Sequence, residues 1–251
     1  MIQRHTRPLW IALFIAAIAL FSVTPAQAEP LDQAVNLLVN PSFEEPYYRF
    51  SNPDGGGAVA TGWEPWWFND EGPVYAVPEY EIAPTEKDPF RVRSGEAAQM
   101  WFRPFILHEA GVYQQVEVGA GNPLRFTVYG HAWSTFCEKE DGQPFDCDYR
   151  DSSKGGINPM FMKIGIDPLG GTDAFSESIV WSPVRGAYDV YELFAVEAVA
   201  QADTVTVYIY SQPQWPATIN NTYWDDAALI ITDGSSPPPA PPPTEGEEGD
   251  G

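Results

Sequence analysis

The sequence predicts an all-β protein, specifically a β-sandwich of the jelly-roll type. Short apolar segments recur along the chain, and several of them alternate apolar and polar side chains with the period of two expected for a strand. The 251 residues include 21 glycines and 25 prolines, which separate these segments as turn residues do. Roughly ten short strands and no sustained helical period favour a sandwich over any mixed fold.

Alternation is clearest in two segments, 124–134 and 204–212. In the first, the predicted inner face is Leu124, Phe126, Val128, Gly130 and Ala132. In the second, it is Val205, Val207 and Ile209. Further strands are predicted around 74–82, 90–92, 97–103, 111–118, 160–166 and 188–196. The segment 47–69, rich in Gly, Pro and Trp, is predicted to be an irregular loop.

The two ends of the chain differ in composition from the part between them. Residues 1–28 resemble a secretory signal peptide, with Arg4 and Arg7, an apolar run from Leu9 to Phe21, and Ala26-Gln27-Ala28 as a cleavage site. Residues 234–251 form a proline-rich acidic tail or linker, which is expected to be extended and solvated. The sandwich therefore occupies residues 29–233, and we expect the protein to be secreted into an extracellular location.

The net charge limits the classes of partner. The whole chain carries a formal charge of −22, which becomes −24 when the predicted signal peptide and its two arginines are removed. Such a chain is repelled by nucleic acid and by anionic membrane surfaces. The apolar run is also too short for a comfortable membrane span. Neutral sugars and divalent cations are compatible with this charge, and the acidity also keeps a secreted protein soluble.

The sequence contains two cysteines, Cys137 and Cys147. In a secreted protein, a nearby pair is most simply a disulfide bond. They flank part of an acidic insertion, 137–156, which is predicted to be a long, solvated loop with a second cation site as the alternative.

Carboxylates stand beside an apolar segment at each end of the predicted domain. The first stretch is Asn36-Leu37-Leu38-Val39-Asn40-Pro41-Ser42-Phe43-Glu44-Glu45, and the last is Tyr223-Trp224-Asp225-Asp226-Ala227-Ala228-Leu229-Ile230-Ile231. If the first and last strands meet, these carboxylates are costly to bury without a hard cation between them. A structural Ca²⁺ is the predicted cofactor.

These two stretches resemble the CenC-type carbohydrate-binding modules and their relatives in the galactose-binding-like jelly-roll superfamily. The resemblance implies that Glu44 and Asp225 are the calcium ligands, with Glu45 and Asp226 as alternatives one position away. These acids could instead cap turns or pair with Arg91 or Arg93. The resemblance also implies that Trp63 packs in the core, and we expect at least one of Trp66 and Trp67 to be buried as well.

A sugar site needs flat aromatic rings for stacking, with amides, carboxylates and guanidinium groups around them. Three rows on the predicted outer strand faces offer this mixture: Gln99, Trp101 and Arg103; then Arg125, Tyr129, His131 and Trp133; then Tyr208, Tyr210 and Gln212. An ordinary outer sheet face would have a similar composition, because Tyr, Thr and Trp suit strands and cross-strand pairs.

The sequence therefore predicts a secreted, non-catalytic domain that binds extracellular or cell-wall polysaccharide. If the natural chain continues, the proline-rich segment would be a spacer to another domain or to the cell wall; if it does not, the segment is a solvated tail. A surface or matrix scaffold that binds other proteins is the alternative function, and a glycan-active enzyme is the third. The sequence contains no Gly-x-Ser-x-Gly or His-Glu-x-x-His motif that would favour catalysis.

Overall fold

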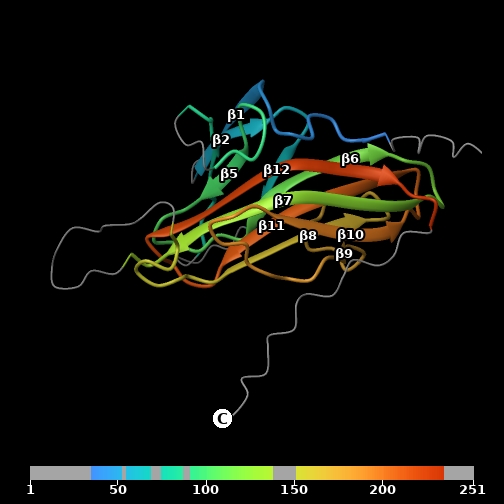
Figure 1. Ribbon diagram of the computed structural model, residues 1–251. Coiled ribbons are helices and arrows are strands. Elements are labelled where there is room, and N and C mark those ends of the chain that lie inside the picture. The colour runs from blue at the N-terminus through green and yellow to red at the C-terminus, as the bar shows by residue number, and fades with distance from the viewer. Residues whose placement is uncertain (1–34, 53–54, 69–74, 87–90, 138–150, 235–251) are drawn as a thin grey trace, which may run out of the picture. The chain divides into compact units, whose positions relative to one another are not determined.

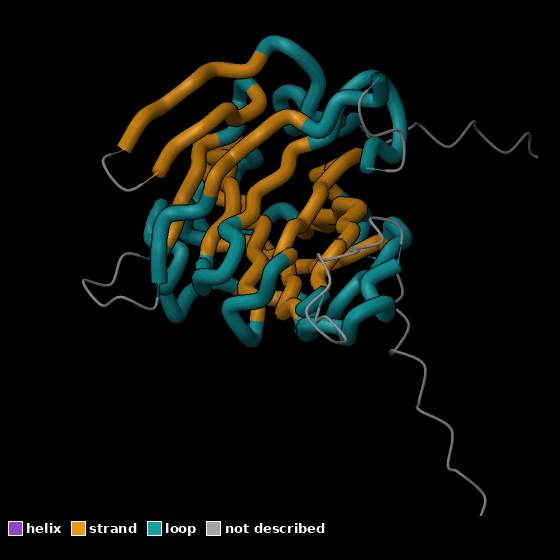
Figure 2. Tube along the Cα trace, turned by 90° about the vertical axis from the view of Figure 1, so that its left-hand side faces the viewer, coloured by secondary structure: helices purple, strands orange, loops and turns teal. Residues whose placement is uncertain are grey.

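The computed structural model describes residues 35–52, 55–68, 75–86, 91–137 and 151–234 (Figure 1). The predicted signal peptide, the tail from residue 235 and most of the acidic insertion lie outside these residues. The described part consists of strands and loops and contains no helix (Figure 2). Accordingly, it contains no helix long and apolar enough to cross a membrane.

The described residues contain twelve strands, which form two sheets. The seven-stranded sheet has the order β1-β2-β4-β5-β12-β7-β10. Its strands are β1 (Tyr47–Asn52), β2 (Gly55–Ala60), β4 (Glu79–Ile82), β5 (Gln99–Phe102), β12 (Ile219–Ile231), β7 (Pro123–Thr135) and β10 (Glu192–Val199). The five-stranded sheet has the order β3-β6-β11-β8-β9. Its strands are β3 (Glu64–Trp67), β6 (Ala110–Glu117), β11 (Thr204–Pro213), β8 (Met160–Asp167) and β9 (Val180–Trp181).

All strand pairs are antiparallel except β2 and β4, which pair in parallel at two positions. The predicted jelly-roll sandwich is confirmed. Strands distant in sequence lie side by side, as β12 does between β5 and β7.

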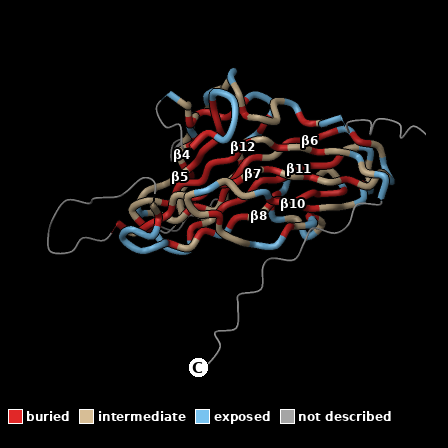
Figure 3. The backbone as a smooth tube through the Cα atoms, viewed as in Figure 1, coloured by how far each residue is buried: buried red, intermediate tan, exposed pale blue. Residues whose placement is uncertain are grey.

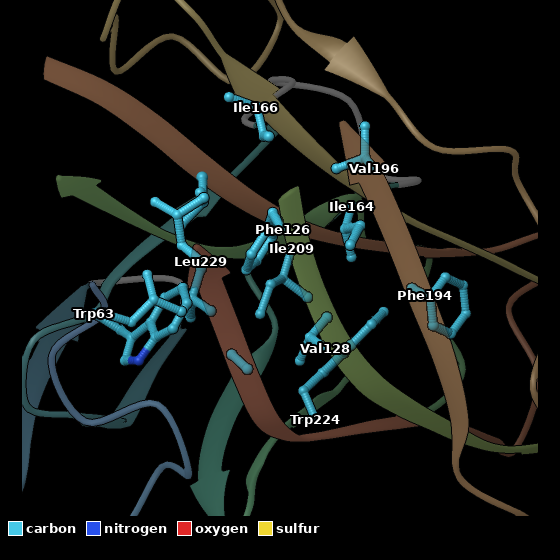
Figure 4. Close-up of a cluster of buried hydrophobic side chains, with 14 of the residues drawn as sticks. Trp63, Phe126, Val128, Ile164, Ile166, Phe194, Val196, Ile209, Trp224 and Leu229 are labelled. Carbon is cyan, nitrogen blue, oxygen red and sulfur yellow. The ribbon is translucent and has the colours of Figure 1, made fainter. Parts of the chain in front are cut away.

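The hydrophobic core lies between the two sheets and contains the predicted inner faces. Leu124, Phe126 and Val128 of β7 and Val205, Val207 and Ile209 of β11 are all buried in one cluster. Figure 4 shows part of this cluster, in which side chains from β7, β8, β10, β11 and β12 are gathered with Trp63. Buried and intermediate positions alternate along the first part of β7, whereas β11 is buried along most of its length (Figure 3).

The segment 47–69 is not the loop that its composition predicts, because it contains β1, β2 and β3. The glycines that suggested a loop, Gly55 to Gly57, belong to β2 and pair with β1, and Gly56 and Gly57 also pair with β4. Gly57 has φ of +140°, and a Cβ on it would lie 1.9 Å from the carbonyl oxygen of Tyr80. Glycine therefore permits a close approach of two backbones that no larger residue allows.

The first segment lies against the last strand, which is the condition on which the expected cation site rested, although residues 35–38 are not a strand. The amide of Leu37 donates to the carbonyl of Leu229, and the Asn36 side chain bonds the backbone of Ala227 and Leu229. Trp63 is fully buried in the core, where its indole Nε1 donates to the Asn40 carbonyl at 3.0 Å. Trp66 is also buried, so both predictions about the tryptophans are confirmed.

Candidate functional site

Aromatic side chains gather on the outer side of the five-stranded sheet. The register of β11 places Tyr208 opposite Tyr113 of β6 and Gly165 of β8. Tyr210 in turn stands opposite Gly111 of β6 and Lys163 of β8. Because side chains alternate along strands, all these residues share the side that faces away from the core. We call this surface the aromatic face and define it as Trp66, Tyr113, Lys163, Trp181, Tyr208 and Tyr210.

Two glycines allow the two tryptophans to lie over the sheet. A Cβ on Gly165 would lie 2.7 Å from the ring of Trp181, and a Cβ on Gly111 would lie 2.8 Å from Nε1 of Trp66. That Nε1 donates to the carbonyl of Ile209 at 3.3 Å. Each glycine thus leaves room for an indole ring on one side of β11.

The rings contact one another at distances typical of aromatic pairs. The centroids of Trp66 and Tyr210 are 5.7 Å apart, and those of Trp181 and Tyr210 are 5.8 Å apart. Tyr208 contacts Tyr113 at 5.7 Å and Trp181 at 6.1 Å. The cluster therefore holds its rings in set orientations before any ligand arrives.

Polar groups lie among the rings. The Tyr210 hydroxyl donates to Glu109 Oε1 at 2.8 Å and lies 2.9 Å from Oε1 of Gln212. Nζ of Lys163 lies 4.1 Å from the ring centroid of Trp181 and 4.3 Å from that of Tyr210. Burial lowers the pKa of this ammonium group, and nearby Glu109 opposes the shift. The arrangement offers rings for stacking together with donors and acceptors for hydroxyl groups.

The segment 168–179, between β8 and β9, packs over part of the aromatic face. Gly171 accepts a hydrogen bond from the Tyr208 hydroxyl at 2.7 Å, and Phe175 contacts the Trp66 ring edge-on at 5.8 Å. Tyr208, Tyr210 and Trp66 are consequently buried, whereas Tyr113, Trp181 and Lys163 remain partly exposed. Burial raises the pKa of both tyrosines, Tyr208 and Tyr210.

The predicted row Tyr208, Tyr210 and Gln212 lies on the outer side of its sheet, as expected. Sequence reasoning missed the other members of the aromatic face, namely Trp66, Tyr113, Lys163 and Trp181. The alternation of β8 contained the signal, because Met160, Met162, Ile164 and Ile166 point inward and leave Lys163 outward. Trp66 and Trp181 carried no comparable signal, since their strands are only four and two residues long.

The predicted placement of Gln99 and Trp101 on an outer face is wrong. Trp101 is 0% exposed in the core, where it stacks on Trp224 at 5.9 Å and donates from Nε1 to Ser211 Oγ. Gln99 is equally buried and bonds the backbone of Ala58 and Ala60. Pairing with β12 decides which side of this four-residue strand faces the core, because both sides carry large apolar residues, Trp101 on one and Met100 and Phe102 on the other. Arg103, beyond the strand end, pairs with Glu79.

The row on β7 lies on the outer side of the seven-stranded sheet, but other residues cover much of it. The Arg93 guanidinium lies 3.5 Å from the ring centroid of Tyr129, and that of Arg91 lies 4.8 Å from the ring centroid of Trp133. His131 is buried and lies 2.9 Å from Arg91. Arg125 is 3.7 Å from Glu197 on the neighbouring strand.

Glu44 and Asp225 converge on one loop, residues 93–96. Both carboxylate oxygens of Glu44 accept from the amide of Glu96, and Oδ2 of Asp225 accepts from the amides of Arg93 and Ser94. A register shift between Asp225 and Ala228 lets two successive acids face this loop. Asp226 pairs with Arg93, so one of the two alternatives foreseen for these acids is confirmed. Glu45 is exposed and accepts from the amide of Tyr47.

These groups fit a hard cation in chemistry, because Ca²⁺ takes carboxylate and carbonyl oxygens. Asp225 is fully buried, and this burial raises its pKa to about 7. Its two oxygens, however, already accept from backbone amides. Within the described residues, no three His, Cys, Asp or Glu side chains are grouped as a metal site. Calcium at Glu44 and Asp225 therefore stays a proposal.

A cleft of about 410 Å³ opens beside β2 and β4. Its charged lining residues are Glu45, Arg49, Glu79, Glu81 and Glu86. Its one aromatic ring, Tyr80, is fully buried in the core and donates its hydroxyl to the carbonyl of Trp66. The cleft consequently offers acceptors but no exposed ring for stacking.

Cys137 is buried and ends one described segment. Cys147 lies outside the described residues, so the disulfide bond between them stays a prediction.

The sequence matches no protein-family model and no curated protein. Comparison with solved structures finds TmCBM61 in complex with β-1,4-galactotriose, at 13% identity and a TM-score of 0.47, covering 79% of this chain and 100% of that one. It also finds the CBM22-1 xylan-binding domain of Xyn10C from Paenibacillus barcinonensis, at 11% identity and a TM-score of 0.40, covering 76% and 90%. A third is the Stig cyclase Fisc from Fischerella sp. TAU, at 12% identity and a TM-score of 0.49, covering 79% and 98%.

Proposed function

We propose that this protein is a secreted, non-catalytic carbohydrate-binding domain and that its aromatic face holds the sugar. One observation carries the proposal. All five strands of the five-stranded sheet contribute, and together they bring six ring or cationic side chains to one side of it, where two glycines make room for the indoles. A preformed, partly exposed aromatic surface with hydrogen-bonding groups at its edge suits a ligand with apolar C–H faces and many hydroxyls.

The partly exposed members would make the direct contacts. Tyr113 and Trp181 lie on opposite sides of Tyr208 and would stack on sugar rings, while Lys163 would donate to a hydroxyl group. Tyr208 and Tyr210 support these side chains from below and are already ordered by contacts with Gly171 and Glu109. Little side-chain entropy would then be lost on binding, which favours affinity.

The test is binding of residues 29–234 to a broad glycan array, followed by titration calorimetry with the best ligand. Trp181→Ala is expected to weaken binding by about tenfold or more, because it removes a stacking ring. Trp133→Ala, on the opposite sheet, is the matched control and should leave affinity unchanged. If the folded wild-type domain binds no glycan on the array, the result would contradict the proposal and favour the protein-binding scaffold.

We further propose that calcium binds at Glu44 and Asp225 and stabilises the fold. What supports it is the convergence of carboxylates from the two ends of the chain on one loop, with Asp225 fully buried. A cation that binds only the folded state would stabilise it by about 2.7 kcal/mol at a concentration one hundred times its Kd. Calcium should raise the melting temperature of the wild type and leave that of Glu44→Gln unchanged. If neither calcium nor a chelator changes the wild-type melting temperature, the proposal that calcium binds here is contradicted.

A further inference from the structure

Two exposed aromatic side chains stand on neighbouring loops. Phe105 lies on the loop between β5 and β6, and Trp215 lies on the loop between β11 and β12. They are 59% and 51% exposed, among the most exposed large apolar side chains of the described residues. The amide of Phe105 donates to the carbonyl of Ala217 at 2.8 Å, and the amide of Ala217 donates to the carbonyl of Trp215 at 2.8 Å. The two loops are therefore joined to each other.

A buried asparagine holds each of these loops. Asn220 accepts from the amide of Arg103 at 2.8 Å and donates to the carbonyls of Arg103 and Ile106. Asn158 donates to the carbonyl of Trp215 at 3.0 Å and accepts from its amide at 3.2 Å. Both asparagines are 0% exposed. The exposed aromatics thus stand on loops whose backbones are fixed by buried side chains.

Phe105 adopts a backbone conformation that a bulky residue rarely takes. Its φ is +63°, in the left-handed region that favours glycine. Such outliers persist only when surrounding structure holds them, and they concentrate at functional sites. The Phe105 ring is 59% exposed, so burial in the core does not account for this conformation.

These loops continue the aromatic face. Phe161, which is 38% exposed, stands opposite Gln212 on the same side of β8 and β11 as Lys163 and Tyr210. The ladder between the two strands extends one step further, since the amide of Gln214 donates to the carbonyl of Pro159. Trp215 follows Tyr210 by five residues, which an extended chain spans in at most about 17 Å.

From this continuity we propose that the bound glycan is the interior of a long chain, which runs from the aromatic face along β11 and past Phe161 to Trp215 and Phe105. This inference rests on the proposed function. The negatively charged chain disfavours anionic membranes and nucleic acid as occupants of the loop aromatics. Two exposed rings on fixed backbones would add stacking contacts for a polymer that a short oligosaccharide cannot reach.

The experiment is calorimetry with oligosaccharides of the glycan that the array identifies, in that glycan's own linkage, from disaccharide to hexasaccharide. Wild-type affinity should rise by about tenfold or more between the short and the long members. Trp215→Ala should lose most of this gain and keep the disaccharide Kd within about twofold of the wild type. Leu193→Ala, an exposed residue on edge strand β10, is the matched control and should retain the gain.

Phe105→Gly separates ligand contact from structural support. Glycine accepts the left-handed conformation, so the variant should fold with an unchanged or higher melting temperature and yet bind the hexasaccharide more weakly. A lower melting temperature with unchanged hexasaccharide affinity would overturn the inference, as would affinity independent of length in the wild type. Absence of binding at every length would contradict the proposed function, and this inference would fall with it.

Discussion

The outer sides of the two sheets contain the same kinds of residue and are organised differently. On the five-stranded sheet, the cation of the cluster, Lys163, comes from the sheet itself and lies beside Trp181 and Tyr210. On the seven-stranded sheet, Arg91 and Arg93 come from the segment before β5 and lie over rings of β7 and β12. We call this second surface the covered face and define it as Arg91, Arg93, Tyr129, His131, Trp133, Tyr191 and Tyr223.

The difference teaches that a row of aromatic residues on a strand does not by itself indicate a ligand site. Rings on the covered face already have a cation as their partner, supplied by another part of the same chain. Partly exposed rings remain on both faces, Tyr113 and Trp181 on the aromatic face and Tyr129 and Trp133 on the covered face. The covering segments differ: residues 168–179 leave Tyr113, Trp181 and Lys163 of the aromatic face partly exposed, whereas the guanidinium groups of Arg91 and Arg93 lie over the rings of Trp133 and Tyr129 themselves.

The largest expected effect concerns Arg91, which is 1% exposed and lies between the rings of Trp133 and Tyr223. Arg91→Ala should lower the free energy of unfolding by about 3 kcal/mol, because it removes two cation–π contacts and a hydrogen bond and leaves a cavity. Chemical denaturation measures this change. Glycan affinity of the folded variant should be unaltered, and a stable variant with weakened binding would make the covered face the site instead.

The second prediction uses pH to probe the covered face. Burial, together with the charge of Arg91, lowers the pKa of His131 to about 3. In the unfolded chain its pKa is about 6.5, so the unfolded state binds more protons between pH 6.5 and 3. The stability that His131 contributes is therefore fully present above pH 6.5 and is lost as pH falls through this window.

From pH 7 to pH 5, this loss amounts to about 2 kcal/mol for one histidine. Denaturation of the wild type and of His131→Gln at both pH values isolates it, because all other groups titrate in both proteins. Buried His108, whose pKa is also lowered to about 3, remains in both. An identical pH dependence in the two proteins would show that folding does not lower the pKa of His131.

The smallest expected effect on stability comes from the glycine under Trp181. A Cβ on Gly165 would lie 2.6 Å from Ile179 and 2.7 Å from Trp181, so Gly165→Ala must displace one of them. Overpacking of this kind costs about 1 to 2 kcal/mol. Glycan affinity should fall several-fold as the indole shifts. Tight binding by a destabilised Gly165→Ala variant would mean that Trp181 does not contact the sugar.

Some of the candidate site followed directly from the sequence. Strand alternation placed Tyr208, Tyr210 and Gln212 on an outer face and Val205, Val207 and Ile209 in the core, because a period of two leaves no other solution for a long strand. The same rule failed for Trp101, since a strand of four consecutive large or polar residues has no preferred face until it pairs with β12. Which side of β5 points to the core depends on its pairing with β12, more than one hundred residues away in the chain.

The sequence by itself determined the fold class and the inner faces of the long strands. Local periodicity and turn residues are sufficient for these, because each depends on residues close together in the chain. Only the tertiary structure decided which rings remain exposed, that Asp226 pairs with Arg93, and that Phe105 and Trp215 stand together. Those outcomes depend on which distant segments pack against each other, and short-range patterns contain no information about that packing.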